Sequence, residues 1–251
     1  MSRIEFYIEE LSKVKDWKTY LLINSNLPGP RGNLELMQAF METGSEEDFI
    51  PLLDYTPDKA PVNSPEEFLA FCGTVGLGKL ISQGQYKYFD KLREQASDPR
   101  WRTREAVAWA LQLIGKKDFG LLLENIDPWI TGNDLEKRAV AAGLCEPVLL
   151  KNSQDSATVI EIIDRITRLS IINKNTRSEE FQVLRKGLGY CWSVAMAANP
   201  AKGKPAFEKL LNINDPDIRW IIKENLKKNR LLKMDPEWVA DMQKKIMHET
   251  I

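Results

Sequence analysis

The chain has 251 residues, of which 43% are hydrophobic and 28% are charged, and its formal net charge is −1 at pH 7. This composition excludes a disordered chain and supports a large buried core, in one solenoid or at most two domains. No apolar run approaches the roughly 20 residues of a membrane span, and residues 1–5 do not resemble a signal peptide. We therefore expect a soluble, cytoplasmic protein without a membrane partner.

Cysteine and histidine usage limits the possible chemistry. Cys72, Cys145 and Cys191 are far apart in apolar surroundings, which is typical of reduced core cysteines and not of a metal site. The single histidine, His248, lies in the C-terminal tail, where we expect fraying. Histidine triads and zinc clusters are thus excluded, and we expect neither a metal nor a cofactor.

The first quarter of the chain predicts short helices separated by rigid loops. Residues 3–24 show one helical apolar stripe, and the glycine- and proline-rich segment 27–33 ends it. Arg31 in this segment is a candidate anion contact, and the alternative is a connector whose Asn33 caps the next helix. Two short helices should follow, at residues 34–42 and 46–53.

The next helix contains a motif that imitates a nucleotide site. Ser64 and Glu67 have the spacing of a capping box, so a helix should begin here. Within it, residues 73–80 fit the P-loop pattern G-x-x-x-x-G-K, but Leu80 replaces the Ser or Thr that holds magnesium. Because no strand precedes the motif, we expect its glycines to let two helices approach closely.

The segment 97–111 is the unit on which the rest of the chain is organised. Asp98 and Pro99 are expected to start a helix, as cap and first helical residue. One helical stripe, buried in our interpretation, comprises Val107, Ala110, Leu111 and Ile114. A second stripe indicates a partner or ligand on another side, and it comprises Trp101, Glu105, Ala108, Trp109 and Gln112.

An acidic residue four positions before an arginine recurs at the head of apolar helices. The arginines of three such copies and of one degraded copy are Arg102, Arg138, Arg185 and Arg219, at steps of 36, 47 and 34 residues. These steps lie within the range of two-helix solenoid repeats. Asp-Pro-x-x-Arg before an alanine-rich helix resembles the second helix of HEAT-type repeats, and the resemblance covers about residues 85–230. It implies that the Asp and Arg residues stack between repeats and are structural.

The second half of the chain continues the helical pattern. Residues 127–129 indicate a turn, and the second repeat copy follows at residues 133–150. Apolar stripes predict helices at 157–169 and 180–197. Two further helices should begin at the cap-then-proline pairs Asp215-Pro216 and Asp235-Pro236.

Basic residues cluster near the C-terminal end of the repeats. The cluster follows Trp220 and comprises Lys223, Lys227, Lys228, Arg230 and Lys233. Basic side chains interleaved with an aromatic ring can contact a phosphate backbone, although such binding usually accompanies a stronger positive balance. The alternative is a solvated helix face.

A functional resemblance follows from the tryptophan-containing repeats. The segments 101–105 and 219–226 are similar in style to the bacterial alkylation-repair DNA glycosylases, which are built from HEAT-like repeats. The resemblance implies that Trp101 packs against a damaged nucleotide, that Glu105 acts as the catalytic carboxylate, and that Arg185 and Trp192 complete the cleft. The glutamate departs from the expected aspartate, and the overall charge is not basic.

The sequence therefore predicts an all-α, HEAT/ARM-like α-α superhelix of about twelve helices. We expect one domain, with capping helices at 1–63, repeats at 64–234 and a last helix at 235–251. We expect a monomeric binding scaffold whose concave face takes a protein or nucleic acid. The alternative is a glycosylase-like protein that binds or excises alkylated bases through Glu105. The candidate binding residues are Trp101, Arg104, Trp109, Arg185, Trp192, Trp220, Lys223 and Lys227.

Overall fold

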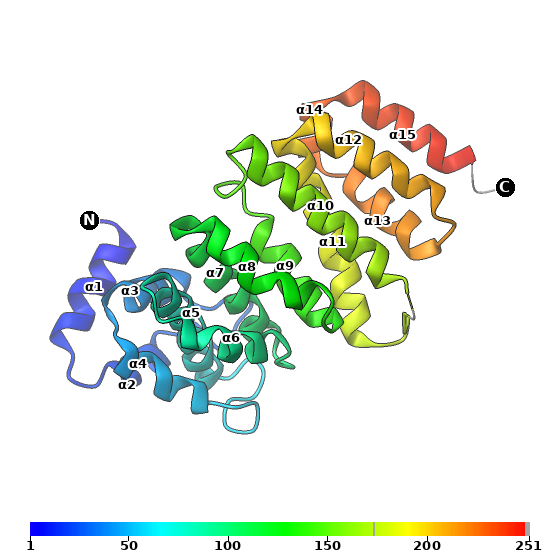
Figure 1. The fold of residues 1–251 in the computed structure, drawn as a ribbon. Helices are drawn as coiled ribbons and strands as arrows, with labels where there is room; N and C mark the ends of the chain where they lie inside the picture. Colours follow the sequence, from blue (N-terminus) through cyan, green and yellow to red (C-terminus); the bar gives the residue numbers. More distant parts are fainter. Residues whose placement is uncertain (173, 249–251) are drawn as a thin grey trace. The chain divides into compact units, whose positions relative to one another are not determined.

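The computed structural model describes residues 1–172 and 174–248, which form helices joined by loops and contain no β-strand (Figure 1). The predicted all-α class is confirmed. Fifteen α-helices lie within this described part, more than the twelve or so that the sequence predicts. The number is higher partly because the segment expected as one helix at residues 3–24 forms two helices. A superhelical arrangement of the helices stays a prediction.

Contacts between helices divide the chain into two compact units, Met1–Lys117 and Asp118–Ile251. The division falls between two helices of the predicted repeat region, and neither of the boundaries expected at residues 63/64 and 234/235 coincides with it. No helix in the described ranges combines the length and apolarity needed to cross a lipid bilayer.

The first unit is built around two helices, α5 and α7, which pack along each other. Helix α5 is buried on nearly all sides, which explains why its sequence is apolar without a periodic polar face. The elements of this unit are α1 (Arg3–Lys13), α2 (Trp17–Ile23), α3 (Leu34–Thr43), α4 (Glu46–Phe49), the 3-10 helix η1 (Ile50–Asp54), α5 (Pro65–Ser82), η2 (Tyr86–Tyr88), α6 (Phe89–Ala96) and α7 (Trp101–Lys117).

The segment expected to be one helix at residues 3–24 is two helices. Helix α1 ends at Lys13, and Asp16 begins α2 by accepting a hydrogen bond from the Thr19 backbone N–H at 3.0 Å. The aspartate offers the chain a new cap within an apolar stripe that continues past it. The next predicted cap is confirmed, because the Asn33 side chain accepts from the Leu36 N–H at the start of α3.

The P-loop-like stretch lies inside helix α5 and is no phosphate loop. A Cβ atom on Gly76 would lie 2.3 Å from the Phe49 ring, so the glycine permits a close contact between elements, as the sequence predicts. Lys79 donates from Nζ to the carbonyl oxygens of Glu42 (2.9 Å) and Gly44 (2.8 Å). The lysine thus caps the end of α3 instead of meeting a phosphate.

The capping box at the start of α5 is half formed. The Ser64 hydroxyl accepts from the Glu67 N–H at 3.3 Å, as expected. The Glu67 carboxylate does not return to the cap residue. It accepts from the Asn63 N–H at 2.7 Å and from Arg102 at 3.0 Å inside the unit.

Helix α7 begins at Trp101, two residues after Pro99, so Asp98 is not its cap. The Asp98 carboxylate instead accepts from the backbone N–H of Arg100 at 2.7 Å, and it pairs with the Arg100 guanidinium at 2.6 Å. Arg100 takes the Asp98 carboxylate in place of the first turn of α7, because the two side chains are buried next to each other. The stripe of Val107, Ala110, Leu111 and Ile114 is fully buried, as predicted.

The second unit surrounds helix α11, which packs against α9, α10 and α13. Its elements are α8 (Phe119–Ile130), α9 (Asp134–Leu144), α10 (Ser153–Ser170), α11 (Glu179–Ala198), α12 (Pro200–Glu208), the 3-10 helix η3 (Lys209–Asn212), α13 (Pro216–Leu226), α14 (Asn229–Met234) and α15 (Pro236–His248). The predicted cap Asp215 is confirmed, since its carboxylate accepts from two N–H groups of the first turn of α13. The turn expected at residues 127–129 is instead the last turn of α8, which includes Pro128 although proline has no N–H to donate to the carbonyl of Glu124 four residues before it.

Two acidic residues of the repeated pattern form ion pairs with lysines of this unit. Asp134 pairs with Lys137 at 3.2 Å, and Asp215 pairs with Lys174 at 2.5 Å. These contacts hold the helix starts that the pattern marks. The three cysteines are buried free thiols, and burial raises the pKa of Cys72 and Cys145 well above the ordinary value. His248 ends α15, and its side chain lies outside the described atoms.

Candidate functional site

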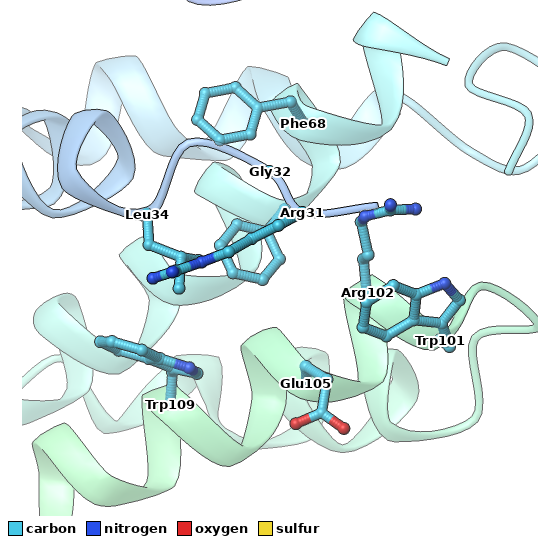
Figure 2. A pocket seen from close by; sticks show the side chains of 9 residues that line it. Arg31, Gly32, Leu34, Phe68, Trp101, Arg102, Glu105 and Trp109 are labelled. Atoms are coloured by element: carbon cyan, nitrogen blue, oxygen red, sulfur yellow. The ribbon is translucent and has the colours of Figure 1, made fainter. Parts of the chain in front are cut away.

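The first unit contains a cavity of about 250 Å³ beside helix α7, here called the aromatic pocket (Figure 2). It brings together three of the candidate residues, which lie one turn apart on one face of α7. The full lining is Arg31, Gly32 and Leu34 from the segment before and into α3, Phe68 and Phe71 from α5, and Trp101, Arg102, Glu105 and Trp109 from α7.

The α7 side of the pocket consists of two indoles with a carboxylate between them. Trp101, Glu105 and Trp109 are spaced by four residues, so they share a helix face (Figure 2). Trp101 is 47% exposed, and Glu105 and Trp109 are half-buried. The two partly exposed tryptophans leave aromatic surface available to a ligand on this face of α7.

The α5 side adds two phenylalanines. Phe68 and Phe71 are nearly parallel, with ring centroids 6.4 Å apart and an interplanar angle of 13°. Both are almost fully buried, so they are fixed parts of the wall. The pocket is therefore lined by aromatic rings on two helices.

Arg31 gives the pocket a positive group on a loop. Its backbone belongs to the glycine- and proline-rich segment, and its side chain is exposed. Figure 2 shows this side chain extending toward the end of the pocket where Leu34 and Trp109 lie. The candidate anion contact of the sequence thus lies at the rim of the same cavity as Glu105.

Arg102 ties the loop to α7. Its Nη2 donates to the Gly29 carbonyl at 2.7 Å and to the Asn63 side-chain oxygen at 3.2 Å. Its Nη1 donates to the Glu67 carboxylate at 3.0 Å. Within the described residues, Nε of Arg102 and Oε1 of Glu67 are buried without a hydrogen-bond partner. Arg102 is only 6% exposed, so it positions the pocket wall from inside.

Arg104 does not contribute to the pocket. It is 6% exposed and donates from Nη1 to the carbonyl oxygens of Asp98 (2.8 Å) and Pro99 (2.7 Å). Arg104 therefore holds the turn that precedes α7.

The remaining candidates belong to the second unit, and two of them, Arg185 and Trp220, lie in one cluster there. The Arg185 guanidinium stacks on the Trp220 ring at 3.9 Å and pairs with Asp217 at 2.8 Å. Lys174 pairs with the same Asp217 at 2.6 Å. Gly189 makes room for this stack, because a Cβ there would lie 2.9 Å from the Trp220 ring. The charges of the cluster are paired with one another, which is typical of a structural role, although Arg185 Nε is buried without a hydrogen-bond partner among the described residues.

Trp192 is a core residue and has no exposed surface for a partner. Its relative exposure is 0%, and its indole N–H donates to the Thr167 hydroxyl at 2.9 Å. Its ring packs 5.3 Å from that of Phe207. Lys223 and Lys227 are exposed, and Lys227 pairs with Glu224 at 2.5 Å.

Sequence reasoning missed the two phenylalanines but named Trp109 as a candidate binding residue. Phe68 and Phe71 are hidden in an apolar helix, where nothing in the pattern distinguishes a pocket wall from a core. Leu113, one turn after Trp109, offers no carboxylate. Glu105 lies one turn before Trp109, so one acid stands between both indoles.

Comparison of the chain with protein-family models, with curated proteins and with solved structures finds no match in any of the three. No group of three or more potential metal ligands gathers among the described residues. The functional assignment therefore depends on the aromatic pocket itself.

Proposed function

We propose that the protein is a HEAT-like helical binding protein, and that its aromatic pocket receives an unstacked alkylated base of DNA. The observation that carries the proposal is the face of Trp101, Glu105 and Trp109 opposite Phe68 and Phe71. The resemblance of the repeats to alkylation-repair glycosylases supports it from the sequence.

Size and lining favour a single planar ring system. A cavity of about 250 Å³ lies just below the roughly 300–1,000 Å³ of drug-sized ligand sites, so a peptide segment would not fit inside it. Stacking of one base on aromatic side chains contributes about 1–3 kcal/mol and suits any base with a free face. The pocket therefore fits one base that has left its stack.

The carboxylate favours a base with positive charge. Alkylation of a purine ring nitrogen makes the ring cationic, and a cation is attracted both to indole faces and to the Glu105 carboxylate. Damaged bases also leave the duplex at lower cost than intact ones, which adds to the selectivity. Arg31, at the rim, would then meet the phosphate next to the extruded nucleotide.

The test is equilibrium binding of a duplex with one N7-methylguanine, compared between wild type and pocket variants. Trp101→Ala and Trp109→Ala should each weaken binding about tenfold, since each removes one stacking surface. Phe6→Ala is the matched control, because Phe6 is 43% exposed on α1 and lies outside the pocket. Equal losses in all three variants, or none in either tryptophan variant, would refute the proposal.

Excision of the base is the second candidate, favoured by the position of Glu105 between the indoles. In that reaction the bond from C1′ to the base nitrogen breaks, and its electron pair leaves with the base, which becomes neutral. The carboxylate stabilises the sugar cation, and water adds to C1′ and releases one proton to the solvent. Glu105→Gln should then abolish base release and keep DNA binding. Base release at the wild-type rate by this variant excludes Glu105 as the catalytic group.

A further inference from the structure

The second unit has a hollow of about 410 Å³ at the turn between α13 and α14, here called the cationic hollow. Its lining is almost entirely basic and comprises Lys227, Lys228, Asn229, Arg230 and Lys233. Four cations thus surround one depression within seven residues of chain. The proposed base pocket does not include any of them.

The turn that carries these cations is fixed by buried neighbours. Leu231 is fully buried and anchors α14. Asn225, also fully buried, donates from Nδ2 to the carbonyl oxygens of Leu188 (2.9 Å) and Ile221 (2.8 Å), and accepts from the Ser193 N–H at 2.8 Å. The Lys228 N–H donates to the Asn225 carbonyl at 2.9 Å. The backbone of the hollow is therefore held in place before any ligand binds.

Tyr190 on α11 positions the central arginine. Nη2 of Arg230 donates to the Tyr190 hydroxyl at 2.5 Å, and the guanidinium carbon lies 4.6 Å from the centroid of the ring. Lys228 Nζ lies 5.8 Å from the same centroid. Tyr190 is 46% exposed, so the cations stand beside an accessible aromatic surface.

Most of this positive charge has no carboxylate beside it. Lys227 pairs with Glu224 at 2.5 Å. Lys228, Arg230 and Lys233 form no ion pair with any carboxylate of the described part. Like charges so close together repel, and a bound polyanion would relieve that repulsion.

We propose that the cationic hollow binds the sugar-phosphate backbone of nucleic acid. A row of three uncompensated cations suits a ligand with repeated phosphates, and the fork of Arg230 suits two phosphate oxygens. An adjacent tyrosine face suits the base or sugar beside them. A membrane surface fits less well, because Leu232 is the single large apolar side chain exposed on α14. The inference goes beyond the proposed function, since it requires neither an alkylated base nor the first unit.

The experiment measures binding of an unmodified fluorescent oligonucleotide, single-stranded and duplex, across a salt series. The variant is Lys228→Gln/Arg230→Gln/Lys233→Gln in the full chain. The control removes three exposed lysines elsewhere in the second unit, as Lys202→Gln/Lys209→Gln/Lys244→Gln. We expect the hollow variant to bind at least tenfold more weakly and to lose roughly 2–3 from the slope of log K against log salt. The control should stay within about twofold of wild type.

Other outcomes overturn the inference. Equal losses in the two triple variants would mean that general charge, not the hollow, attracts DNA. Binding to phosphatidylserine vesicles or to polyglutamate without binding to either oligonucleotide would assign the hollow to another partner. Lys233→Glu alone, on an exposed side chain that folding does not need, should lower affinity if the triple variant does not fold. The hollow variant should bind the N7-methylguanine duplex and the unmodified duplex more weakly by the same factor, which separates failure of the pocket from failure of the hollow.

Discussion

The guanidinium of Arg102 lies 4.5 Å from the centroid of the Trp101 ring, although the two residues are adjacent in the sequence. Arg102 is buried and its neighbour is 47% exposed. The arginine thus connects the interior network of Glu67 and Asn63 to the indole at the mouth of the aromatic pocket. Substitution of Arg102 should therefore lower the stability of the protein, whereas substitution of Trp101 should weaken ligand binding.

Arg102→Met is predicted to destabilise the protein by about 3–5 kcal/mol, because it leaves the buried Glu67 carboxylate without its cation. The double variant Glu67→Gln/Arg102→Met removes both charges and should recover part of that loss. The free energy of unfolding in urea measures both. A double variant less stable than Arg102→Met would show that the pairing is not the source of the loss.

Trp192→Ala should lower the stability of the protein, whereas Trp101→Ala should leave stability nearly unchanged. Trp192 is fully buried, so its truncation is expected to cost about 3–5 kcal/mol of stability. Trp101 is half exposed, so its truncation should change stability by less than about 1 kcal/mol and act on binding instead. Thermal unfolding of the two variants measures this difference in stability. Similar losses of stability would place Trp101 in the core and remove it from the site.

Glycines of α5 provide a test of its close packing. Gly78→Ala should destabilise by about 1–3 kcal/mol, because the new Cβ would lie 2.5 Å from the Cα of Ala110 on α7. Gly187→Ala on α11 is the matched control, since its Cβ meets only the Arg138 side chain at 3.5 Å. The control should be neutral or more stable by up to about 1 kcal/mol. Unfolding midpoints that rise in both variants would contradict the packing described for α5.

The shifted pKa values of Asp215 and Lys174 predict how the stability of the protein depends on pH. Burial raises the pKa of Asp215, but hydrogen bonds from Lys174 and from the first turn of α13 outweigh it and leave this pKa below 3.8. Burial lowers the pKa of Lys174, and bonds to Asp215 and Asp217 leave it above 10.5. The aspartate therefore stabilises the fold above its ordinary pKa, and this contribution is lost as the pH falls through the lowered value. The lysine stabilises below 10.5, and its contribution is lost as the pH rises past the raised value.

Asp215→Asn isolates the charge, since asparagine still caps a helix. The variant should lose stability at neutral pH, and the difference from wild type should shrink as the pH falls below about 4. The free energy of unfolding across pH 2–7 checks this. A difference that is constant over that range would show that the carboxylate charge contributes nothing.

The sequence predicted the helical class and many helix starts because these depend on local signals. Three caps accept hydrogen bonds from the first turns of their own helices, and these bonds do not depend on the rest of the fold. They are Asn33, Ser64 and Asp215. Asp98 failed as a cap because a buried neighbour, Arg100, takes its carboxylate, and burial is a tertiary property.

The candidate site was predicted only in part for the same reason. Helical spacing places Trp101, Glu105 and Trp109 on one face, so a single helix contains that information. The opposite wall comes from Phe68, far away in the sequence, and only packing of α5 against α7 reveals it. Trp192 shows the converse. The sequence resemblance implied that it completes a cleft, but the structure buries it in the core, where its indole N–H donates to the Thr167 hydroxyl.

The measurement that tests the central claim most directly is the affinity of the wild-type protein for two duplexes that differ in one base. One duplex contains a single N7-methylguanine, and the other contains guanine at that position. The aromatic pocket predicts at least tenfold tighter binding of the alkylated duplex, and loss of that preference when Trp101 and Trp109 are both changed to alanine. Equal affinity of the wild-type protein for the two duplexes would contradict the assignment of the pocket to an alkylated base.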